Sequence, residues 1–204
     1  MPAQRFPVTF LVAVLIAAVV GWISPAQAAD PEEPAGPVLL VAKRQLQDPA
    51  YRSTVLLVRP IGEDQHVGVI LNRPSKITLG QLFPEHKPSQ AVRDPVYMGG
   101  PTNTSVIFAL VKSHDGIAGK SLQLMPDVFM VFEGGAVDQV IEKDAAQARY
   151  LAGLVAWQPG ELREEIKRGA WYVLDADPSV VLRKSTEGMW EELIRRAEMA
   201  ANGI

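Results

Sequence analysis

Short apolar and β-branched runs, each bounded by turn residues, fill the first two thirds of the chain. They cover residues 38–42, 54–59, 67–72, 96–98, 105–110 and 128–132. Proline, glycine and aspartate stand at their ends, as in Asp48-Pro49 and Arg73-Pro74. This pattern predicts β-strands. Because the runs are continuous rather than alternating, several strands are expected to be buried on both faces.

Helical spacing becomes frequent in the second half. Val137, Val140 and Ile141 follow an i, i+3, i+4 pattern, and residues 161–168 have one apolar and one charged side. A last stripe contains Trp190, Leu193, Ile194 and Ala197. Residues 78–82 suggest a short helix and 171–174 another strand, whereas 150–157 fit either a buried strand or a helix end. Segregated strands and helices predict a single α+β domain.

The first 28 residues have the layout of a secretory signal peptide. Arg5 precedes an apolar stretch over residues 8–23, and a small-residue cleavage pattern ends at Ala28. An uncleaved membrane anchor is the alternative, but spanning a bilayer takes about 20 apolar residues, and this stretch is shorter. We therefore expect cleavage after Ala28, a Pro- and acid-rich linker over residues 29–37, and a folded domain over 38–204. The expected location is periplasmic or secreted, with no stable membrane anchor.

Composition removes several kinds of chemistry. The chain has no cysteine, which excludes disulfides, thiol catalysis and thiolate metal sites. The formal net charge is −3, and loss of Arg5 on cleavage leaves 19 basic against 23 acidic residues, a net −4. An acidic chain without a basic stripe or a cationic recognition helix argues against nucleic-acid binding.

Two strand ends carry polar residues that are candidates for a site. Asp48 before Pro49 favours a turn in which the carboxylate accepts local backbone N–H groups, and the alternative is an acid at the mouth of a pocket. Pro74 holds Arg73 extended, beside Asn72, so the guanidinium is expected to point away from the sheet. Arginine there suits either a buried salt bridge, with Asp48, Asp94 or Glu161 as partner, or recognition of a carboxylate or phosphate.

Glycine motifs and histidines offer less chemistry. Gly99-Gly100-Pro101 permits a tight turn, a bulge or a small anion nest, and a tight turn is expected. Residues 116–121 are similar to a phosphate-binding loop, but His114 occupies the first glycine position and a strand-like run follows, which excludes that assignment.

The three histidines lack metal-ligand spacing, and no metal or other cofactor is expected. His66 and His86 are expected in solvated loops.

Four segments together resemble the YqgE/AlgH family of bacterial proteins. They are residues 46–51 (LQDPAY), 68–74 (GVILNRP), 96–101 (VYMGGP) and 153–162 (GLVAWQPGEL). The resemblance covers nearly all of the body from Val38 onward. It implies a mainly antiparallel, branched sheet curled into a partial barrel with flanking helices, and it favours a strand over residues 150–157. The family has no established molecular activity, so no reaction is implied.

This chain departs from the family pattern at several positions. Leu154, Ala156 and Glu161 replace the usual tyrosine, glycine and glutamine, and Lys43-Arg44 stands where a Met-Pro pair is usual. The signal peptide is also unusual for the family, whose members are as a rule cytoplasmic.

The expected function is a non-enzymatic binding or regulatory domain with a protein or small-molecule partner. The alternative is an enzyme or small-ligand site built on Asp48, Asn72 and Arg73, near Gly99 and Gly100. One family member has a reputation as a transcriptional regulator, a role opposed here by the acidic charge and the predicted export.

Overall fold

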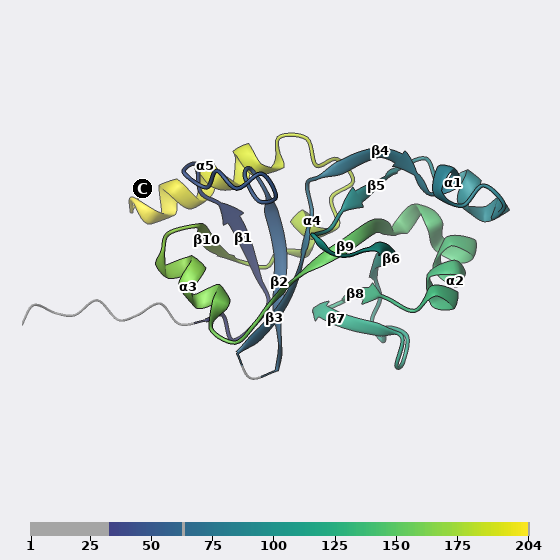
Figure 1. The fold of residues 1–204 in the computed structure, drawn as a ribbon, viewed down its shortest axis with the longest axis horizontal. Coiled ribbons are helices and arrows are strands. Elements are labelled where there is room, and N and C mark those ends of the chain that lie inside the picture. Colours follow the sequence, from purple (N-terminus) through teal and green to yellow (C-terminus); the bar gives the residue numbers. More distant parts are fainter. Residues whose placement is uncertain (1–32, 63, 204) are drawn as a thin grey trace, which may run out of the picture.

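A curled, branched sheet with helices at both ends organises the chain (Figure 1). The computed structural model describes residues 33–62 and 64–203. Over these residues the expected α+β class and the partial barrel are confirmed. The predicted signal peptide and the first residues of the predicted linker lie outside the described residues.

Ten strands make up the sheet of the described part. They are β1 (Val38–Ala42), β2 (Val55–Gly62), β3 (Gln65–Ile70), β4 (Pro74–Thr78), β5 (Pro95–Met98), β6 (Thr102–Lys112), β7 (Ser121–Met125), β8 (Val128–Val131), β9 (Arg149–Trp157) and β10 (Trp171–Asp175). The α-helices are α1 (Leu79–Leu82), α2 (Gly134–Asp144), α3 (Glu161–Lys167), α4 (Pro178–Val181) and α5 (Met189–Ala201). Two 3₁₀ helices span η1 (Lys87–Ala91) and η2 (Ala145–Gln147).

The expected strands and helices are present, with differences at prolines. Strand β2 continues through Pro60 instead of ending before it. Pro74, which was expected only to bound the preceding strand, is the first residue of β4. Proline is tolerated at the first residue of a strand and beside a bulge, because its missing N–H then removes no ladder hydrogen bond. The β2–β3 register does shift between Pro60 and Gly62. Residues 150–157 lie in β9, as the resemblance favours.

Strand β9 is the branch point of the sheet. The strand order is β10-β1-β2-β3-β9-β6-β8-β7, and β9 also pairs with β5, which pairs with β4. The β9–β3 pairing is antiparallel and uses the C-terminal part of β9, whereas the parallel β5 pairing uses Leu151 and Ala152. The far edge curls back, and the Arg59 guanidinium of β2 donates to the Gln123 carbonyl of β7.

Both faces of the first strands are buried, as their continuous apolar runs predict. In β1, Leu39 and Val41 belong to the core beneath α5, whereas Leu40 and Ala42 belong to the core on the side of α3. A further core lies between α2 and strands β5, β6 and β9. Helices thus cover both faces of these first strands. Neither face requires polar side chains, so these strands show no alternation of apolar and polar residues.

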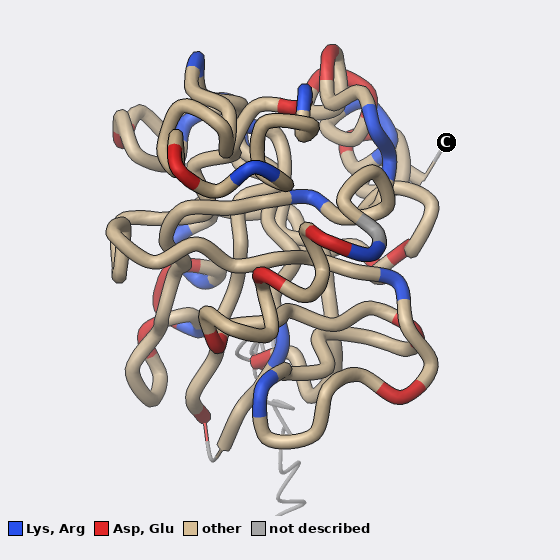
Figure 2. Tube along the Cα trace, turned by 90° about the vertical axis from the view of Figure 1, so that its right-hand side faces the viewer, with Lys and Arg blue, Asp and Glu red and all other residues tan. Residues whose placement is uncertain are grey.

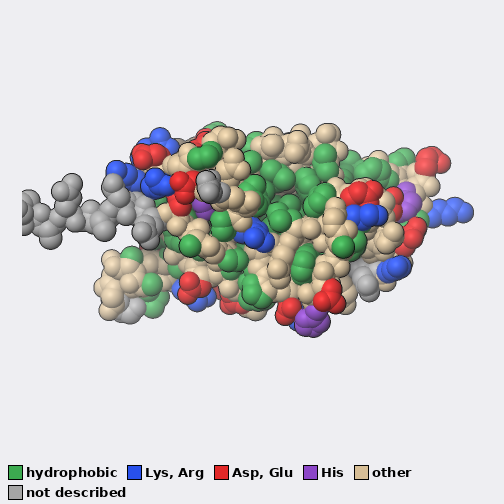
Figure 3. Space-filling model, turned by 90° about the horizontal axis from the view of Figure 1, so that it is seen from below, with side chains coloured by type: hydrophobic (Ala, Val, Ile, Leu, Met, Phe, Trp, Pro, Cys, Tyr) green, Lys and Arg blue, Asp and Glu red, His purple; other side chains and the backbone are tan. Residues whose placement is uncertain are grey.

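Charges of both signs are interspersed along the chain on the side shown in Figure 2. Seen from below, hydrophobic side chains gather near the middle of the surface, and charged ones are more frequent toward its ends (Figure 3). Among the described helices, none is long and apolar enough to span a membrane.

Candidate functional site

The side chain of Asn72 binds both sides of the turn that precedes β2. Its Oδ1 accepts the Val55 N–H at 2.8 Å, and its Nδ2 donates to the Ser53 carbonyl at 2.9 Å. Ser53 has a positive φ of 57°, which is uncommon for a residue with a Cβ. The amide of Asn72 therefore uses its acceptor and one donor to hold a strained turn.

Arg73 holds the same loop from the next position. Its Nη1 donates to the Ala50 carbonyl at 2.6 Å, and its Nη2 lies 3.4 Å from the Arg52 carbonyl. No carboxylate of the described residues lies within 4.0 Å of this guanidinium. Of the alternatives for Arg73, the salt bridge with Asp48, Asp94 or Glu161 is therefore wrong. The loop curls so that its carbonyl groups, rather than an acidic side chain, face the guanidinium.

Asp48 forms the turn that its place before proline predicts. Its Oδ1 accepts the Ala50 N–H at 2.7 Å, and its carbonyl accepts the N–H groups of Tyr51 and Arg52. Asp48 is exposed, and it also lines a cavity described below. The Asp48 side chain thus forms the local turn and also lines a pocket, so both interpretations of this residue apply.

Gly99 and Gly100 allow two backbones to touch rather than forming a tight turn. A Cβ on Gly99 would lie 2.3 Å from the Gly153 carbonyl oxygen, and one on Gly100 would lie 2.2 Å from the Leu154 carbonyl. Gly99 donates to the Ala152 carbonyl and accepts from Ile70, which joins β3 to β9. The expected tight turn is replaced by a close approach, for which only glycine leaves room.

The segments around Arg73 and the Gly99-Gly100 pair meet through their backbones. The Met98 N–H donates to the Arg73 carbonyl at 2.8 Å, next to the Ile70–Gly99 hydrogen bond. On the other side of Arg73 stands the loop that begins at Asp48. Asn72 and Arg73 therefore connect this loop to the glycine pair.

The loop held by Asn72 and Arg73 forms one wall of a cavity of about 330 Å³, here called the loop pocket. Helix α3 and strand β10 form the opposite wall. Its lining residues are Gln45, Leu46, Asp48, Tyr51, Glu165, Arg168, Gly169, Ala170 and Trp171. A pocket of this volume lies at the lower end of the range for small-molecule sites, about 300–1,000 Å³.

Two aromatic rings and one carboxylate give the loop pocket a fixed interior. The rings of Tyr51 and Trp171 pack edge to face, with centroids 5.9 Å apart. One oxygen of Glu165, Oε2, accepts the indole N–H of Trp171 at 2.8 Å and that of Trp157 at 3.0 Å. Trp157 and Trp171 are both buried. Glu165 is therefore oriented by two rigid donors.

The acids around the loop pocket affect the pKa of the Tyr51 phenol. Burial raises the pKa of its phenol, and the negative charges of Glu165, Asp48 and Glu161 raise it further. Tyr51 and Glu165 are the residues that sequence reasoning missed. Tyr51 closes the LQDPAY segment, so its position was visible, whereas the pairing of Glu165 with two tryptophans depends on how α3 packs.

A buried arginine was also missed. Arg149, at the start of β9, is 9% exposed and donates to the carbonyls of Leu71, Val181 and Arg183. Its guanidinium lies 4.9 Å from the centre of the Tyr97 ring. Burial lowers the pKa of Arg149, with Tyr97 and Asp94 opposing that shift. These contacts tie the loop after α4 to the sheet and leave a cavity of only about 20 Å³.

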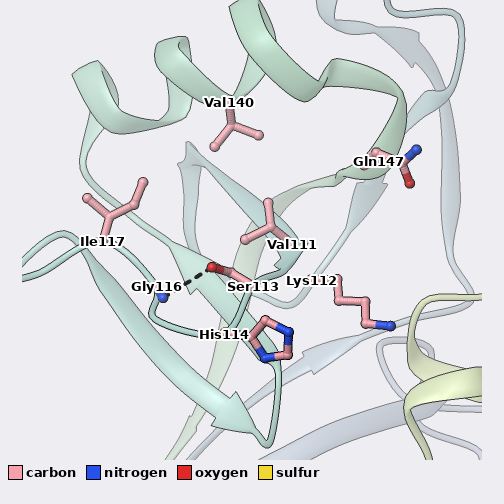
Figure 4. Close-up of a pocket in the computed structure, with 8 residues that line it drawn as sticks. All are labelled: Val111, Lys112, Ser113, His114, Gly116, Ile117, Val140 and Gln147. Carbon is pink, nitrogen blue, oxygen red and sulfur yellow. Dashed lines mark hydrogen bonds between the residues drawn. The ribbon is translucent and has the colours of Figure 1, made fainter.

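Three larger cavities lie at the α2 end of the molecule: one of about 420 Å³ between η1 and the end of α2, and two of greater volume. One, of about 480 Å³, has Val140 of α2 above Val111 of β6, with Lys112 and His114 at its edge (Figure 4). The other, of about 490 Å³, is mainly apolar and includes the exposed Phe83 and Phe132. None of the residues that the sequence singled out as site candidates lines any of the three cavities.

The histidines are placed differently from one another. His66 is buried in β3, with Nε2 3.1 Å from the Pro34 carbonyl, so the solvated loop expected for it is wrong. Strand β3 begins before His66, and the His66 side chain lies beneath the N-terminal segment. His86 is half-buried, 2.7 Å from the Ser89 hydroxyl. Over residues 33–62 and 64–203, no group of His, Asp and Glu side chains could hold a metal ion.

Comparisons with known proteins agree on one family. A family model described as AlgH-like matches residues 39–202. A UPF0301 protein of Thermobifida fusca is 35% identical over 167 residues, which cover 78% of this chain and 84% of that protein. A UPF0301 protein of Ruegeria pomeroyi is 32% identical over 164 residues, covering 77% and 88%.

Solved structures show the same fold. A crystal structure of a Corynebacterium diphtheriae protein matches with a TM-score of 0.66 at 28% identity, covering 81% of this chain and 88% of that one. The solution structure of the AlgH protein from Pseudomonas aeruginosa also has a TM-score of 0.66, at 23% identity, covering 81% and 91%. With a matching family model over most of its length and relatives above 30% identity, this chain belongs to the AlgH-like family.

Proposed function

We propose that this protein is a non-enzymatic binding domain and that the loop pocket is its ligand site. One observation carries this proposal: Asn72 and Arg73 direct their polar side-chain atoms to the backbone of residues 50–55, which builds a pocket wall. Residues whose hydrogen bonds hold a pocket wall in place act as supports for the groups that touch a ligand.

The same contacts weaken the enzyme alternative built on Asp48, Asn72 and Arg73. A catalytic base or an electrophilic donor needs a polar atom directed at the reacting group. Here Oδ1 of Asn72 is bonded to the Val55 N–H, and of the two Asp48 oxygens only Oδ1 is bonded, to the Ala50 N–H. Nη1 of Arg73 is bonded to Ala50 as well. What remains at the pocket is an aromatic surface with fixed carboxylates, which is typical of recognition.

Binding is tested by thermal unfolding of the full chain with a panel of small cationic, anionic, zwitterionic and neutral metabolites. A ligand that binds only the folded state at 100 times its Kd stabilises that state by about 2.7 kcal/mol. We expect at least one compound to raise the Tm, and Arg168→Gln or Asp48→Asn in the pocket to change that rise. Asp115→Asn, in the β6–β7 connection, is the matched control and should leave it unchanged. A panel with no active compound contradicts the proposal.

We further propose that the protein acts outside the cytoplasm and begins at Ala29 after cleavage. The support is the basic, apolar and small-residue order of residues 1–28. In the same setting, nucleic acid is not a partner, which agrees with the acidic net charge. Cell fractionation with N-terminal sequencing tests this point, and cytosolic protein that starts at Met1 would refute it.

A further inference from the structure

We infer that the loop pocket takes an organic ammonium ion, held between the Tyr51–Trp171 ring pair and the carboxylates of Asp48 and Glu165. This inference rests on the proposed function, because it names the class of ligand for the same pocket. Aromatic rings attract cations through the negative faces of their π-systems, and the attraction grows when the cation is partly removed from water.

The aromatic surface is rigid before any ligand arrives. Trp171 is 4% exposed and is held by Glu165, and Tyr51 is packed edge to face against it. Tyr51 is half-buried, so part of its side chain remains open to the cavity that it lines. A preorganised ring pair loses little conformational entropy when it binds a ligand.

Two carboxylates of the lining keep an unused oxygen. Glu165 receives both indole donors at Oε2, and Asp48 receives the Ala50 N–H at Oδ1. Within the described part of the chain, Oε1 of Glu165 and Oδ2 of Asp48 accept no hydrogen bond. An ammonium group is the complement of such oxygens, because it supplies positive charge and, when it carries hydrogens, up to three donors.

The field inside the pocket also favours a cation. Glu165, Asp48 and Glu161 all act on the Tyr51 phenol in the same direction and raise its pKa, in addition to the larger effect of burial. An anion at this position would meet three like charges, which costs free energy at close range.

Two basic residues border the pocket and offset part of the negative charge of these acids. Arg168 is exposed at the edge of the lining, where solvent screens its charge. The Nζ of Lys43 lies 4.7 Å from the centre of the Tyr172 ring. The same Nζ would lie 3.8 Å from a Cβ on Gly169, which lines the pocket, so Lys43 also borders the pocket. Arg168 could still meet the carboxylate of a zwitterion whose ammonium end lies between the acids.

The indole N–H signals of the full chain provide a direct test by ¹H–¹⁵N spectroscopy with choline chloride as the probe. The signals are assigned with single Trp→Phe variants. Trp171 and Trp157 report on the pocket because both donate to Glu165, whereas Trp190 donates to the Ala42 carbonyl and serves as the internal reference. Potassium chloride at matched concentration corrects for ionic strength.

We expect choline to shift the Trp171 signal in a saturable manner, with a smaller shift at Trp157 and none at Trp190. Asp48→Asn should weaken choline binding about tenfold or more, a loss that corresponds to about 1.4 kcal/mol. Asparagine can form the same turn through its side-chain oxygen, so this variant should still fold. Asp115→Asn should leave the affinity within about twofold, the change expected for a screened surface charge.

The outcomes separate this inference from the proposed function. If sodium acetate or glucose shifts the Trp171 signal and choline does not, the pocket binds a ligand but the cation assignment is overturned. If choline binds equally well to Asp48→Asn and to the unmodified chain, the assignment of the carboxylates is overturned. If no probe of any class shifts Trp171 or Trp157, both the cation assignment and the pocket as a ligand site are overturned.

Discussion

The carboxylate of Glu33 caps helix α3 by accepting the backbone N–H of Arg163 at 3.2 Å, although 130 positions separate the two residues. The same carboxylate lies 3.6 Å from the Arg163 guanidinium, and its side chain is 6% exposed. The residue before the helix, Gly160, has no side chain to cap it. Pro34 continues the contact through its carbonyl and His66. The described end of the predicted linker, residues 33–37, is thus bound to the domain.

The first prediction follows from this cap. Glu33→Ala should lower the free energy of unfolding by about 1 kcal/mol, the usual cost of losing a capping side chain. Glu33→Gln should cost less, because an amide oxygen still accepts the Arg163 N–H. Urea unfolding measures both. Asp64→Asn is the control: Asp64 also pairs with Arg163 at 3.3 Å but is exposed, so the change should stay within about 0.5 kcal/mol. Equal losses in Glu33→Ala and Asp64→Asn would show that the cap contributes nothing.

The second prediction concerns the support of the loop pocket. Arg73→Ala and Asn72→Ala should each cost about 1–3 kcal/mol, because backbone carbonyl or N–H groups of residues 50–55 lose their partners. Arg52→Ala is the matched control in the same loop, since Arg52 uses its carbonyl and not its side chain in this contact. That variant should remain within about 0.5 kcal/mol. Thermal unfolding that is unchanged in Arg73→Ala and Asn72→Ala would remove their structural role.

The third prediction tests the glycine contact between the β5–β6 connection and β9. In Gly100→Ala, the new Cβ would lie 2.2 Å from the Leu154 carbonyl, so the two backbones must separate. The cost should reach or exceed about 3 kcal/mol, the upper part of the range for overpacking. Gly134→Ala, where nothing lies within 4 Å, should be neutral or slightly stabilising. Chemical denaturation gives both values, and a neutral Gly100→Ala would contradict the close approach.

The fourth prediction uses the raised pKa of Tyr51. An unfolded tyrosine ionises near pH ~10. In the folded protein, burial and then Glu165, Asp48 and Glu161 hold the proton to higher pH. The resulting stability is complete below pH ~10 and is lost as the pH rises through the folded pKa. Tyr51→Phe, which keeps the ring, should therefore lose less free energy of unfolding than the unmodified chain between about pH 9 and 11. Identical losses in the two proteins would contradict the assignment.

The amino-acid sequence by itself determined the local structure. Continuous apolar runs predicted β1, β5 and β8 within a residue or two, because burial on both faces leaves no polar position in a strand. The apolar stripe of residues 190–197 predicted α5 for the same reason of burial on one side. Asp48-Pro49 predicted its turn, since an Asx turn needs only neighbouring backbone groups.

Only the tertiary structure decided which distant groups meet. An acidic partner was one alternative for Arg73, yet the register of β2 and β3 places the carbonyls of the 48–54 loop against it. His66 was expected in solvent, and the N-terminal segment covers it. The contacts of Glu165 with Trp157 and Trp171 depend on how α3 packs against β9 and β10. Such contacts join segments far apart in the chain, so they arise from strand order and helix packing, which no local pattern of residues encodes.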